Sequence, residues 1–418
     1  MNILPKNSSQ FKRNIFSMLK GSTFAQIINV LGALYLAKEY EESIYGEFGI
    51  FISTLSILSI LFTLNLDNVL VLSKNKDAAN KTLVKIITLA FIFTAVFVGI
   101  IAVLSSFFEV ISDISTLLYL SVLGCLVFTI KSNCEYYFTF AKKFKIIANA
   151  KIVYSFLTVL IQFLFFKLEI EQGLIFGFLI ATFVILVIYS FSLEKKYFVK
   201  KESYRGIKNF YKEYRNLIRF GLPSNLINAF ANHILTILIG IFFSKSAAGV
   251  YSIALKILNI PLMVISSSIT QVYYQKAVEY YEKIPQELYS FSKKIIRNNV
   301  LVMLVIIIIT NTIGEYLLEL FFGKSYEDLG IYLAVVSVLI LGRICFNPIS
   351  SLLVIFDKLK LGLLFNTTLL ILNLVGIYIG FLFQDLVYGI TILSIFGSIL
   401  YILITLYFLK LMKQLTYA

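Results

Sequence analysis

Long apolar runs separated by short polar stretches dominate the pattern of this chain. A helix that crosses a bilayer needs about 20 predominantly apolar residues. Twelve segments meet this requirement: residues 20–38, 45–66, 84–107, 114–138, 146–166, 173–193, 217–243, 247–273, 295–318, 330–355, 359–382 and 386–409. Strands of an outer-membrane barrel would be only about 10 residues long and would alternate in character. The pattern therefore predicts an all-α integral membrane protein with twelve transmembrane helices.

Composition supports the same class. Of the 418 residues, 59% are hydrophobic and 14% are charged, with a mean hydropathy of +0.87. Soluble domains average about 45–50% apolar and about 25% charged residues. This composition excludes a soluble enzyme, a nucleic-acid-binding protein and a secreted disulfide scaffold. The chain has one histidine, and its three cysteines lie in apolar runs. We therefore expect no metal site and no cofactor, and the lack of a Walker motif argues against ATP-driven transport by this chain alone.

The basic residues are distributed unevenly between the two sides of the predicted membrane. The chain carries 37 Lys and Arg residues and a formal net charge of +14. If both termini are cytoplasmic, most of these residues fall on the inner side, and the outer turns hold only Lys38, Lys167, Lys245 and Lys324. Cytoplasmic loops are enriched in Lys and Arg. The distribution predicts cytoplasmic termini and explains the positive charge without a nucleic acid partner.

One basic and aromatic segment, residues 194–216, divides the chain into two halves of six predicted spans. We expect an N-terminal lobe over 1–193, this cytoplasmic inter-lobe linker, and a C-terminal lobe over 217–418. The linker sequence, EKKYFVKKESYRGIKNFYKEYRN, suits an amphipathic segment on anionic lipid headgroups. A solvated basic loop is the alternative interpretation.

The two halves open with similar sequences. GSTFAQIIN from Gly21 is matched by GLPSNLINAF from Gly221, and SIYGEFGIFISTLSIL from Ser43 is matched by AAGVYSIALKILNIP from Ala247. Because six spans return the chain to the same side, the halves would be parallel repeats related by an axis along the membrane normal. The pattern suggests a transporter whose two six-helix lobes rock around a central cavity.

Polar side chains inside the predicted spans mark candidate cavity-lining positions. Asn225, Asn228 and Asn232 recur at helical spacing in the seventh span, with His233 beside them, and Gln26 and Asn29 form a similar pattern in the first. We predict that both spans line a wet central cavity. Alternatively, the amides only form hydrogen bonds to neighbouring helices.

Charged residues inside the spans are candidates for substrate binding. Lys256 and Arg343 lie closest to the predicted midplane, and Lys131 lies deeper toward the cytoplasmic side. All three could hold an anionic group such as a phosphate. Lys131 could instead be neutralised by Glu135, four residues on. Lys256 and Arg343 could instead form ion pairs or extend toward the headgroups.

Two acids are candidates for ion coupling, namely Asp67 at the end of the second span and Glu135 in the fourth. A carboxyl group in a low-dielectric environment has a raised pKa and can titrate near neutrality. His233 is a further candidate for proton relay. The alternative interpretations are a helix-end residue beside Lys74 for Asp67 and a buried neutral side chain for His233.

Several stretches together resemble the Wzx-type O-antigen and polysaccharide flippases of the multidrug/oligosaccharidyl-lipid/polysaccharide superfamily. They are GSTFAQIINVLGALYLAKEYEESIYGEFGIF, LDNVLVLSKNKDAAN, RFGLPSNLINAFANHIL, AAGVYSIALKILNIPL and ELFFGKSYEDLGIYLAVVS. The resemblance implies two six-helix lobes around a central cavity. It also implies translocation of an undecaprenyl-diphosphate-linked oligosaccharide, an O-antigen or capsule repeat unit, across the inner membrane of a bacterium. Ion or proton coupling would drive alternating access.

The resemblance also implies partners and leaves alternatives. Besides the lipid-linked substrate and anionic lipids, a polysaccharide polymerase and a chain-length regulator are candidate partners. The alternatives within the superfamily are a lipid II flippase and a cation-coupled multidrug exporter. A membrane polymerase or acyltransferase is a more distant alternative, because the sequence offers neither a large outer loop nor a catalytic constellation.

Overall fold

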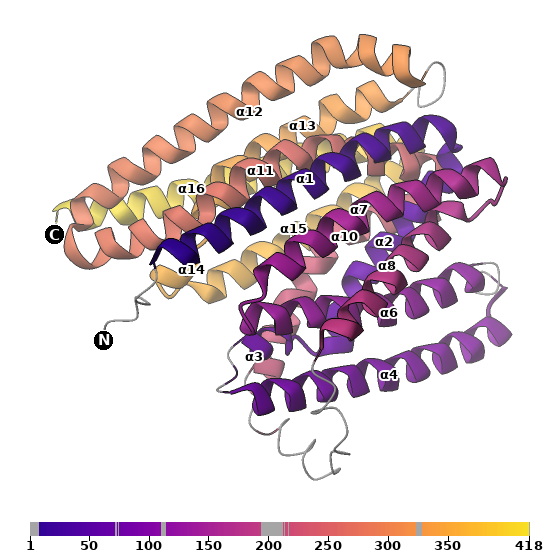
Figure 1. Ribbon diagram of the computed structural model, residues 1–418. Helices are drawn as coiled ribbons and strands as arrows, with labels where there is room; N and C mark the ends of the chain where they lie inside the picture. Colours follow the sequence, from indigo (N-terminus) through magenta and orange to yellow (C-terminus); the bar gives the residue numbers. More distant parts are fainter. Residues whose placement is uncertain are drawn as a thin grey trace. The chain divides into compact units, whose positions relative to one another are not determined.

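A computed structural model describes residues 8–71, 73, 75–109, 114–193, 212, 214–215, 217–322 and 328–417 (Figure 1). All regular elements within these ranges are helical. In chain order they are α1 (Ser8–Glu39), α2 (Glu42–Thr63), α3 (Asp67–Val71), α4 (Lys76–Phe107), α6 (Ser115–Phe140), α7 (Phe144–Lys167), α8 (Gly173–Ser192), the π-helical turn η2 (Leu217–Gly221), α10 (Leu222–Phe242), α11 (Lys245–Lys283), α12 (Pro285–Phe322), α13 (Leu329–Phe346), the 3-10 turn η3 (Asn347–Ile349), α14 (Leu352–Ile355), α15 (Leu359–Leu382) and α16 (Leu386–Tyr417).

Ten segments of the described chain are long and apolar enough to cross a membrane. They are Glu42–Thr63, Lys76–Phe107, Ser115–Phe140, Phe144–Lys167, Gly173–Ser192, Leu222–Phe242, Pro285–Thr312, Leu329–Ile349, Leu359–Leu382 and Leu386–Gln414. Each overlaps one of the twelve predicted spans. The other two predicted spans, 20–38 and 247–273, lie inside α1 and α11, helices whose side chains are described only in part.

The chain forms two compact units. Unit 1 comprises residues 1–40 and 50–226, and unit 2 comprises residues 41–49 and 227–418. The first two turns of α2 therefore pack with unit 2. The predicted linker 194–216 lies outside the described residues except for Lys212, Tyr214 and Arg215.

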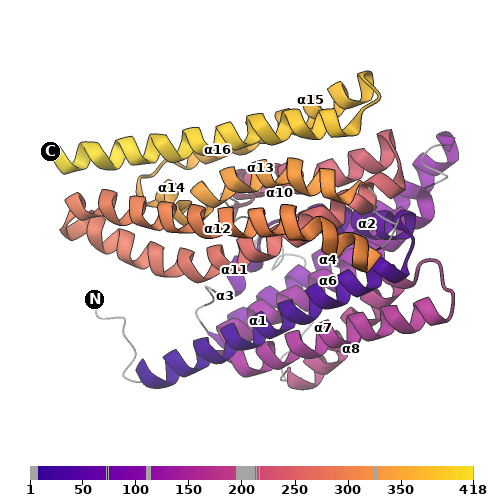
Figure 2. The same ribbon diagram turned by 90° about the horizontal axis from the view of Figure 1, so that it is seen from above.

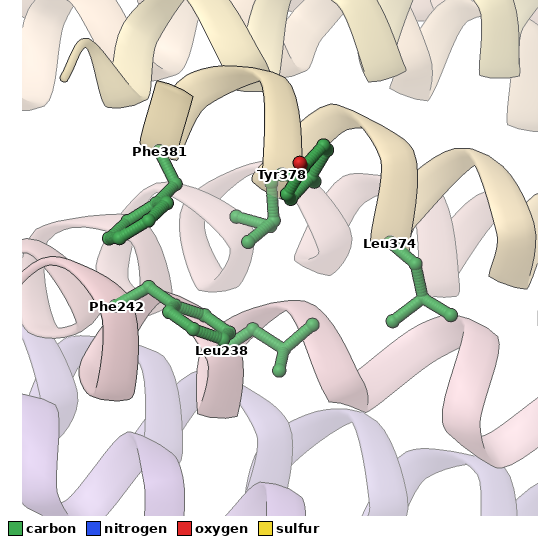
Figure 3. Close-up of a pocket in the computed structure, with 6 residues that line it drawn as sticks. Leu238, Phe242, Leu374, Tyr378 and Phe381 are labelled. Atoms are coloured by element: carbon green, nitrogen blue, oxygen red, sulfur yellow. The ribbon is translucent and has the colours of Figure 1, made fainter. Parts of the chain in front are cut away.

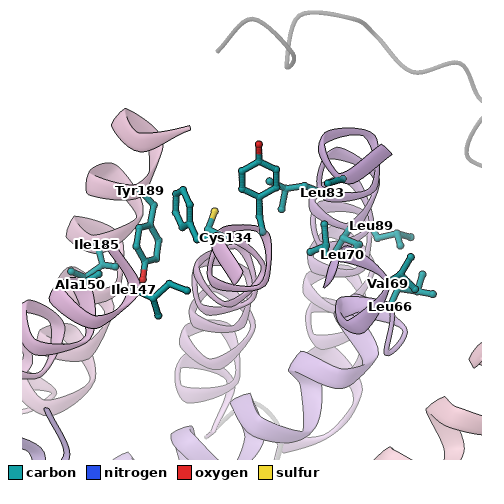
Figure 4. Close-up of a cluster of buried hydrophobic side chains, with 14 residues drawn as sticks. Leu66, Val69, Leu70, Leu83, Leu89, Cys134, Ile147, Ala150, Ile185 and Tyr189 are labelled. Carbon is teal, nitrogen blue, oxygen red and sulfur yellow. The ribbon is translucent and has the colours of Figure 1, made fainter. Parts of the chain in front are cut away.

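Unit 1 has a continuous apolar core at one end of its helices. Figure 4 shows part of it, where Tyr189 and Ile185 of α8 lie against Ile147 and Ala150 of α7. The core continues through α6 to α3 and α4, where Leu70 is fully buried. Because α3 is only five residues long, this packing rather than helix propensity holds it in place.

The seam between α1 and α7 in unit 1 is tightly closed. Gly32 of α1 faces Val159 of α7 so closely that a Cβ atom would overlap the valine methyl groups. Asn29 Nδ2 donates a 2.9 Å hydrogen bond to Ser155 Oγ, and the Tyr40 hydroxyl donates one of 2.8 Å to the Gln162 carbonyl. Small residues let transmembrane helices approach closely, so Gly32 is what allows this seam to close.

Unit 2 uses glycines for a different seam, between α15 and α16, which run side by side in Figure 2. Gly376 and Gly380 of α15 pack on Gly389 of α16 at backbone distance. Within α15, one turn before Gly376, Asn373 Nδ2 donates a buried 2.6 Å hydrogen bond to the Ala231 carbonyl of α10. The glycines of α15 thus contact α16, and the larger side chains of α15 lie on another face of the helix.

Candidate functional site

Helix α10 presents a row of exposed amides. Asn225, Asn228 and Asn232 are all exposed, and they follow one face of the helix. Asn232 Nδ2 donates to the Asn228 carbonyl at 2.8 Å and is 3.1 Å from Asn228 Oδ1, so the two side chains order each other. The helix begins after a π-helical turn, with Pro223 in its first turn, where proline is tolerated. The row offers donors and acceptors suited to a polar ligand such as a sugar.

The corresponding amides of α1 are less available. Asn29 is partly buried and donates to Ser155 of α7, as described above. Gln26 is also partly buried. Asn29 therefore serves the packing of unit 1, whereas the α10 amides remain exposed.

Lys131 lies in a compensated environment on α6. Its Nζ is 3.4 Å from Glu135 Oε1, and the two side chains are 10% and 21% exposed. The Nζ also lies 4.2 Å from the ring centroid of Tyr154 and 5.4 Å from that of Phe128. The Tyr189 hydroxyl donates to Glu135 Oε1 at 3.3 Å. A carboxylate and two aromatic faces thus share the charge of this lysine.

Arg343 of α13 lies in a different environment. Its Nε is buried and has no hydrogen-bond partner among the described residues. His233 of α10 and Tyr251 of α11 are close enough to interact with its charge. Lys256, also on α11, is partly buried. Since a buried donor without a partner is costly, Arg343 is suited to bind an anion from outside the described chain.

Asp67 lies at a break in the second predicted span. Leu64 and Asn65 adopt left-handed backbone conformations, with φ of 50° and 60°, and separate α2 from α3. Asp67 begins α3, and its buried Oδ1 has no hydrogen-bond partner within the described part of the chain. Burial raises the pKa of Asp67 to about 6, although a hydrogen bond with Thr63 opposes the shift. Burial therefore favours the protonated form of this carboxyl group.

The break also creates a contact that the sequence did not reveal. Asn225 Nδ2 donates a 2.6 Å hydrogen bond to Asn65 Oδ1, which joins the start of α10 to the end of α2. Asparagine tolerates the left-handed conformation better than most residues, so the LNLDN stretch was the only signal of a break. Nothing in the spacing pointed to Asn225 as its partner.

The repeated glycines of the two halves meet each other in unit 2. A Cβ on Gly46 would overlap the Lys245 carbonyl, and a Cβ on Gly249 would overlap the Glu42 carbonyl. Each glycine thus faces the carbonyl four residues before the other. Lys245 Nζ is 2.6 Å from Glu47 Oε1, and Ser246 donates to Glu42 beside the crossing. The sequence showed the repetition but not this contact.

The described residues contain no group of three or more His, Cys, Asp or Glu side chains that could hold a metal ion. The candidate groups are instead the buried carboxyl group of Asp67 in unit 1 and, in unit 2, the α10 amides Asn228 and Asn232 and the guanidinium of Arg343.

The sequence of this chain matches one known protein family. Residues 41–330 match the family described as polysaccharide biosynthesis protein. None of the curated proteins matches the chain significantly. The match confirms the resemblance to Wzx-type proteins that the sequence motifs indicated.

Solved transporters share the fold. The lipid II flippase MurJ in an inward closed conformation matches with a TM-score of 0.71 and 16% identity, over 95% of this chain and 87% of that chain. The inward-facing conformation of a multidrug resistance MATE family transporter of the MOP superfamily matches with a TM-score of 0.64 and 14% identity, over 93% and 96%. An outward-facing conformation of such a transporter gives 0.60 and 14%, over 96% and 94%.

These likenesses confirm an all-helical, multi-pass membrane protein of the MATE and MurJ fold. The family match covers well over half of the chain. The chain therefore belongs to the polysaccharide biosynthesis protein family.

Proposed function

We propose that this protein is a flippase for an undecaprenyl-diphosphate-linked oligosaccharide, the repeat unit of an O-antigen, a capsule or an exopolysaccharide. It would act in the cytoplasmic membrane of a bacterium, with twelve spans in two six-helix lobes and cytoplasmic termini. The observation that carries the proposal is the family match over residues 41–330. A protein of polysaccharide biosynthesis with a transporter fold has to move a polysaccharide or its precursor.

The diphosphate would bind to Arg343. Guanidinium groups form strong, charge-assisted hydrogen bonds with phosphate oxygens, and the buried Nε of this residue has no partner among the described residues. Lys256 is the second candidate. Lys131 is less suited, because Glu135 and two aromatic rings already compensate its charge.

The sugar would contact the exposed amides of α10. Asn228 and Asn232 carry both donors and acceptors at a spacing of one helical turn, and sugar hydroxyls need both. We assign Gln26 and Asn29 a secondary role, since both are partly buried.

Proton uptake by Asp67 would couple transport to the ion gradient. The buried Oδ1 of this carboxyl group has no partner among the residues that the structure describes, and its pKa is about 6. Glu135 is a weaker candidate, because its carboxylate is already engaged by Lys131 Nζ at 3.4 Å. His233 is a further candidate for proton relay, and it lies close enough to Arg343 to interact with its charge.

Gene deletion and complementation in the native host test the proposal. Loss of surface polysaccharide, with the lipid-linked repeat unit retained on the cytoplasmic side, is the expected result. Arg343→Met and Lys256→Met should fail to restore the polymer. Lys283→Met is the matched control, because Lys283 is an exposed lysine that pairs with the exposed Glu279, and it should restore the polymer fully.

Normal surface polymer in a deletion strain without a redundant exporter would overturn the proposal. Transport of a peptidoglycan precursor or of a drug would then become the leading hypothesis. The polymerase and chain-length regulator of the same pathway are the protein partners we expect, and anionic lipids would contact the basic residues of 194–216.

A further inference from the structure

An apolar groove lies between α10 and α15 in unit 2 (Figure 3). Its volume is about 300 Å³, and it is open on one side. The lining residues come from both helices: Leu238, Phe242, Leu374, Ile377, Tyr378 and Phe381. The only polar atom of these side chains is the Tyr378 hydroxyl, so the groove suits a hydrocarbon rather than a sugar or an ion.

Two contacts between α10 and α15 border the groove. Near one end Asn373 Nδ2 donates to the Ala231 carbonyl at 2.6 Å. At the other end the rings of Phe242 and Phe381 lie 5.5 Å apart. Eight residues of α15 separate the two contacts, a rise of about 12 Å. The groove is therefore an elongated slot between fixed ends.

The predicted repeat relation matches this slot to a seam of unit 1 that is closed. Helices α1 and α7 of unit 1 occupy the first and fifth spans of their half, as α10 and α15 do in the second. In unit 1 that seam is closed by Gly32 against Val159. In unit 2 the glycines of α15 contact α16 instead. Unit 2 thus has an open slot between α10 and α15 where unit 1 has a closed seam between α1 and α7.

The groove is continuous with the surface that faces the lipid. Both of its helices are candidate spans, and four lining residues are 45–62% exposed: Phe242, Leu374, Tyr378 and Phe381. In the membrane, this surface is surrounded by hydrocarbon. A chain that enters the slot from the bilayer would exchange one apolar environment for another.

Helix α10 also carries the amide row. Asn232 precedes Leu238 by six residues, about 9 Å along the axis and about 120° around it. One helix thus offers an exposed polar face and, beyond it on another face, an apolar slot. In a molecule with a sugar head and a long hydrocarbon tail, the head would match the amides and the tail would match the slot.

We propose that the groove between α10 and α15 binds the polyprenyl tail of the lipid-linked substrate while the amide row of α10 receives its head group. This inference rests on the proposed function. It assigns the tail a specific position on the protein rather than leaving it free in the bilayer.

Photolabelling in lipid nanodiscs tests the proposal. The probe is a long-chain polyprenyl diphosphate with a diazirine on its tail, and the labelled peptides are identified by mass spectrometry. Labelling should concentrate on the lining residues of α10 and α15. Unlabelled polyprenyl diphosphate should compete several-fold better than phosphatidylglycerol.

Matched variants sharpen the test. Leu374→Trp and Leu238→Trp fill the slot from opposite walls, and each should reduce labelling several-fold. Ile371→Trp changes an equally exposed aliphatic residue of α15 outside the lining, with 53% exposure against 45% for Leu374. This control should leave labelling unchanged and should report whether a tryptophan on this helix permits folding.

Two outcomes would overturn the inference. One is labelling elsewhere with none in the groove, and the other is equal competition by phosphatidylglycerol, which would make the slot an ordinary lipid-facing crevice. If wild-type protein restores the surface polymer but shows either outcome, only the tail site fails. If the groove is labelled but deletion leaves the polymer intact, the proposed function fails instead.

Discussion

The two units differ in the number of partners that surround a cation within a predicted span. In unit 1 Lys131 is surrounded by a carboxylate and two aromatic rings. In unit 2 the buried Nε of Arg343 has no partner among the described residues. A buried charge that is compensated supports a fixed structure, whereas a buried donor without a partner is costly and favours binding of an acceptor. Burial of a cation is therefore less informative about ligand binding than the number of its partners.

The seams between helices show the same contrast. Unit 1 closes α1 on α7 with a glycine and two hydrogen bonds. Unit 2 leaves a slot between α10 and α15. We infer that unit 1 is the more rigidly packed at this position and that unit 2 provides more of the ligand surface.

Glu135→Gln should have the largest effect on stability. Removing one partner of a buried ion pair costs about 3–5 kcal/mol, and we expect about 3 kcal/mol here because Glu135 is 21% exposed. Chemical unfolding in detergent measures the loss. Glu279→Gln is the control, because its pair with Lys283 is mostly exposed and contributes at most about 1 kcal/mol. Equal losses would remove the distinction between compensated and exposed pairs.

Gly32→Leu should rank second. The added side chain would collide with Val159, and overpacking costs about 1–3 kcal/mol. Gly99→Leu is the matched control, since no atom lies within 4 Å of a Cβ at that position in α4. The melting temperature should be lowered by Gly32→Leu and unchanged or raised by Gly99→Leu. An unaltered melting temperature for Gly32→Leu would contradict the closed seam.

Asp67→Asn should alter the pH dependence of stability. The pKa of Asp67 is about 6 in the folded protein and 3.8 as the reference value, so the folded state holds the proton more tightly. Stability from this group is then greatest at low pH and falls as the pH rises from about 4 to 6. Asp67→Asn should lose this fall of stability with rising pH. Tyr136 of α6 interacts electrostatically with Asp67, so Tyr136→Phe is a useful control that should retain it. Parallel melting curves for wild type and Asp67→Asn would contradict the prediction.

Arg343→Met should have the smallest effect on stability and a complete effect on transport. The change removes a buried donor that lacks a partner, so the free energy of unfolding should stay within about 1 kcal/mol of wild type. Complementation should fail nonetheless. A loss of several kcal/mol would show instead that Arg343 is a structural residue like Lys131.

Much of the helical framework could be predicted from the sequence. Apolar runs of about 20 residues placed ten of the candidate spans, because length and hydropathy suffice to define a membrane helix. Periodicity also grouped Asn225, Asn228 and Asn232 on one face, since helical geometry fixes that relation. The four-residue spacing of Lys131 and Glu135 allowed their contact for the same reason.

Contacts between distant helices could not be predicted. The bond between Asn65 and Asn225 joins residues 160 positions apart, and it depends on a left-handed break that no periodicity reveals. The groove exists because the glycines of α15 contact α16 rather than α10, and the sequence does not show which helix they contact. Periodicity gives the face of a helix but not the partner of that face.

The crossing of Gly46 and Gly249 has the form of a self-complementary interface. Each glycine meets the carbonyl four residues before the other, as equivalent residues do across the twofold axis of a homodimer. The obstruction at each glycine is backbone, so no smaller side chain on the opposite helix could compensate for a larger residue there. Both positions are therefore restricted to glycine, and the crossing has, within one polypeptide, the geometry of a contact between two identical subunits.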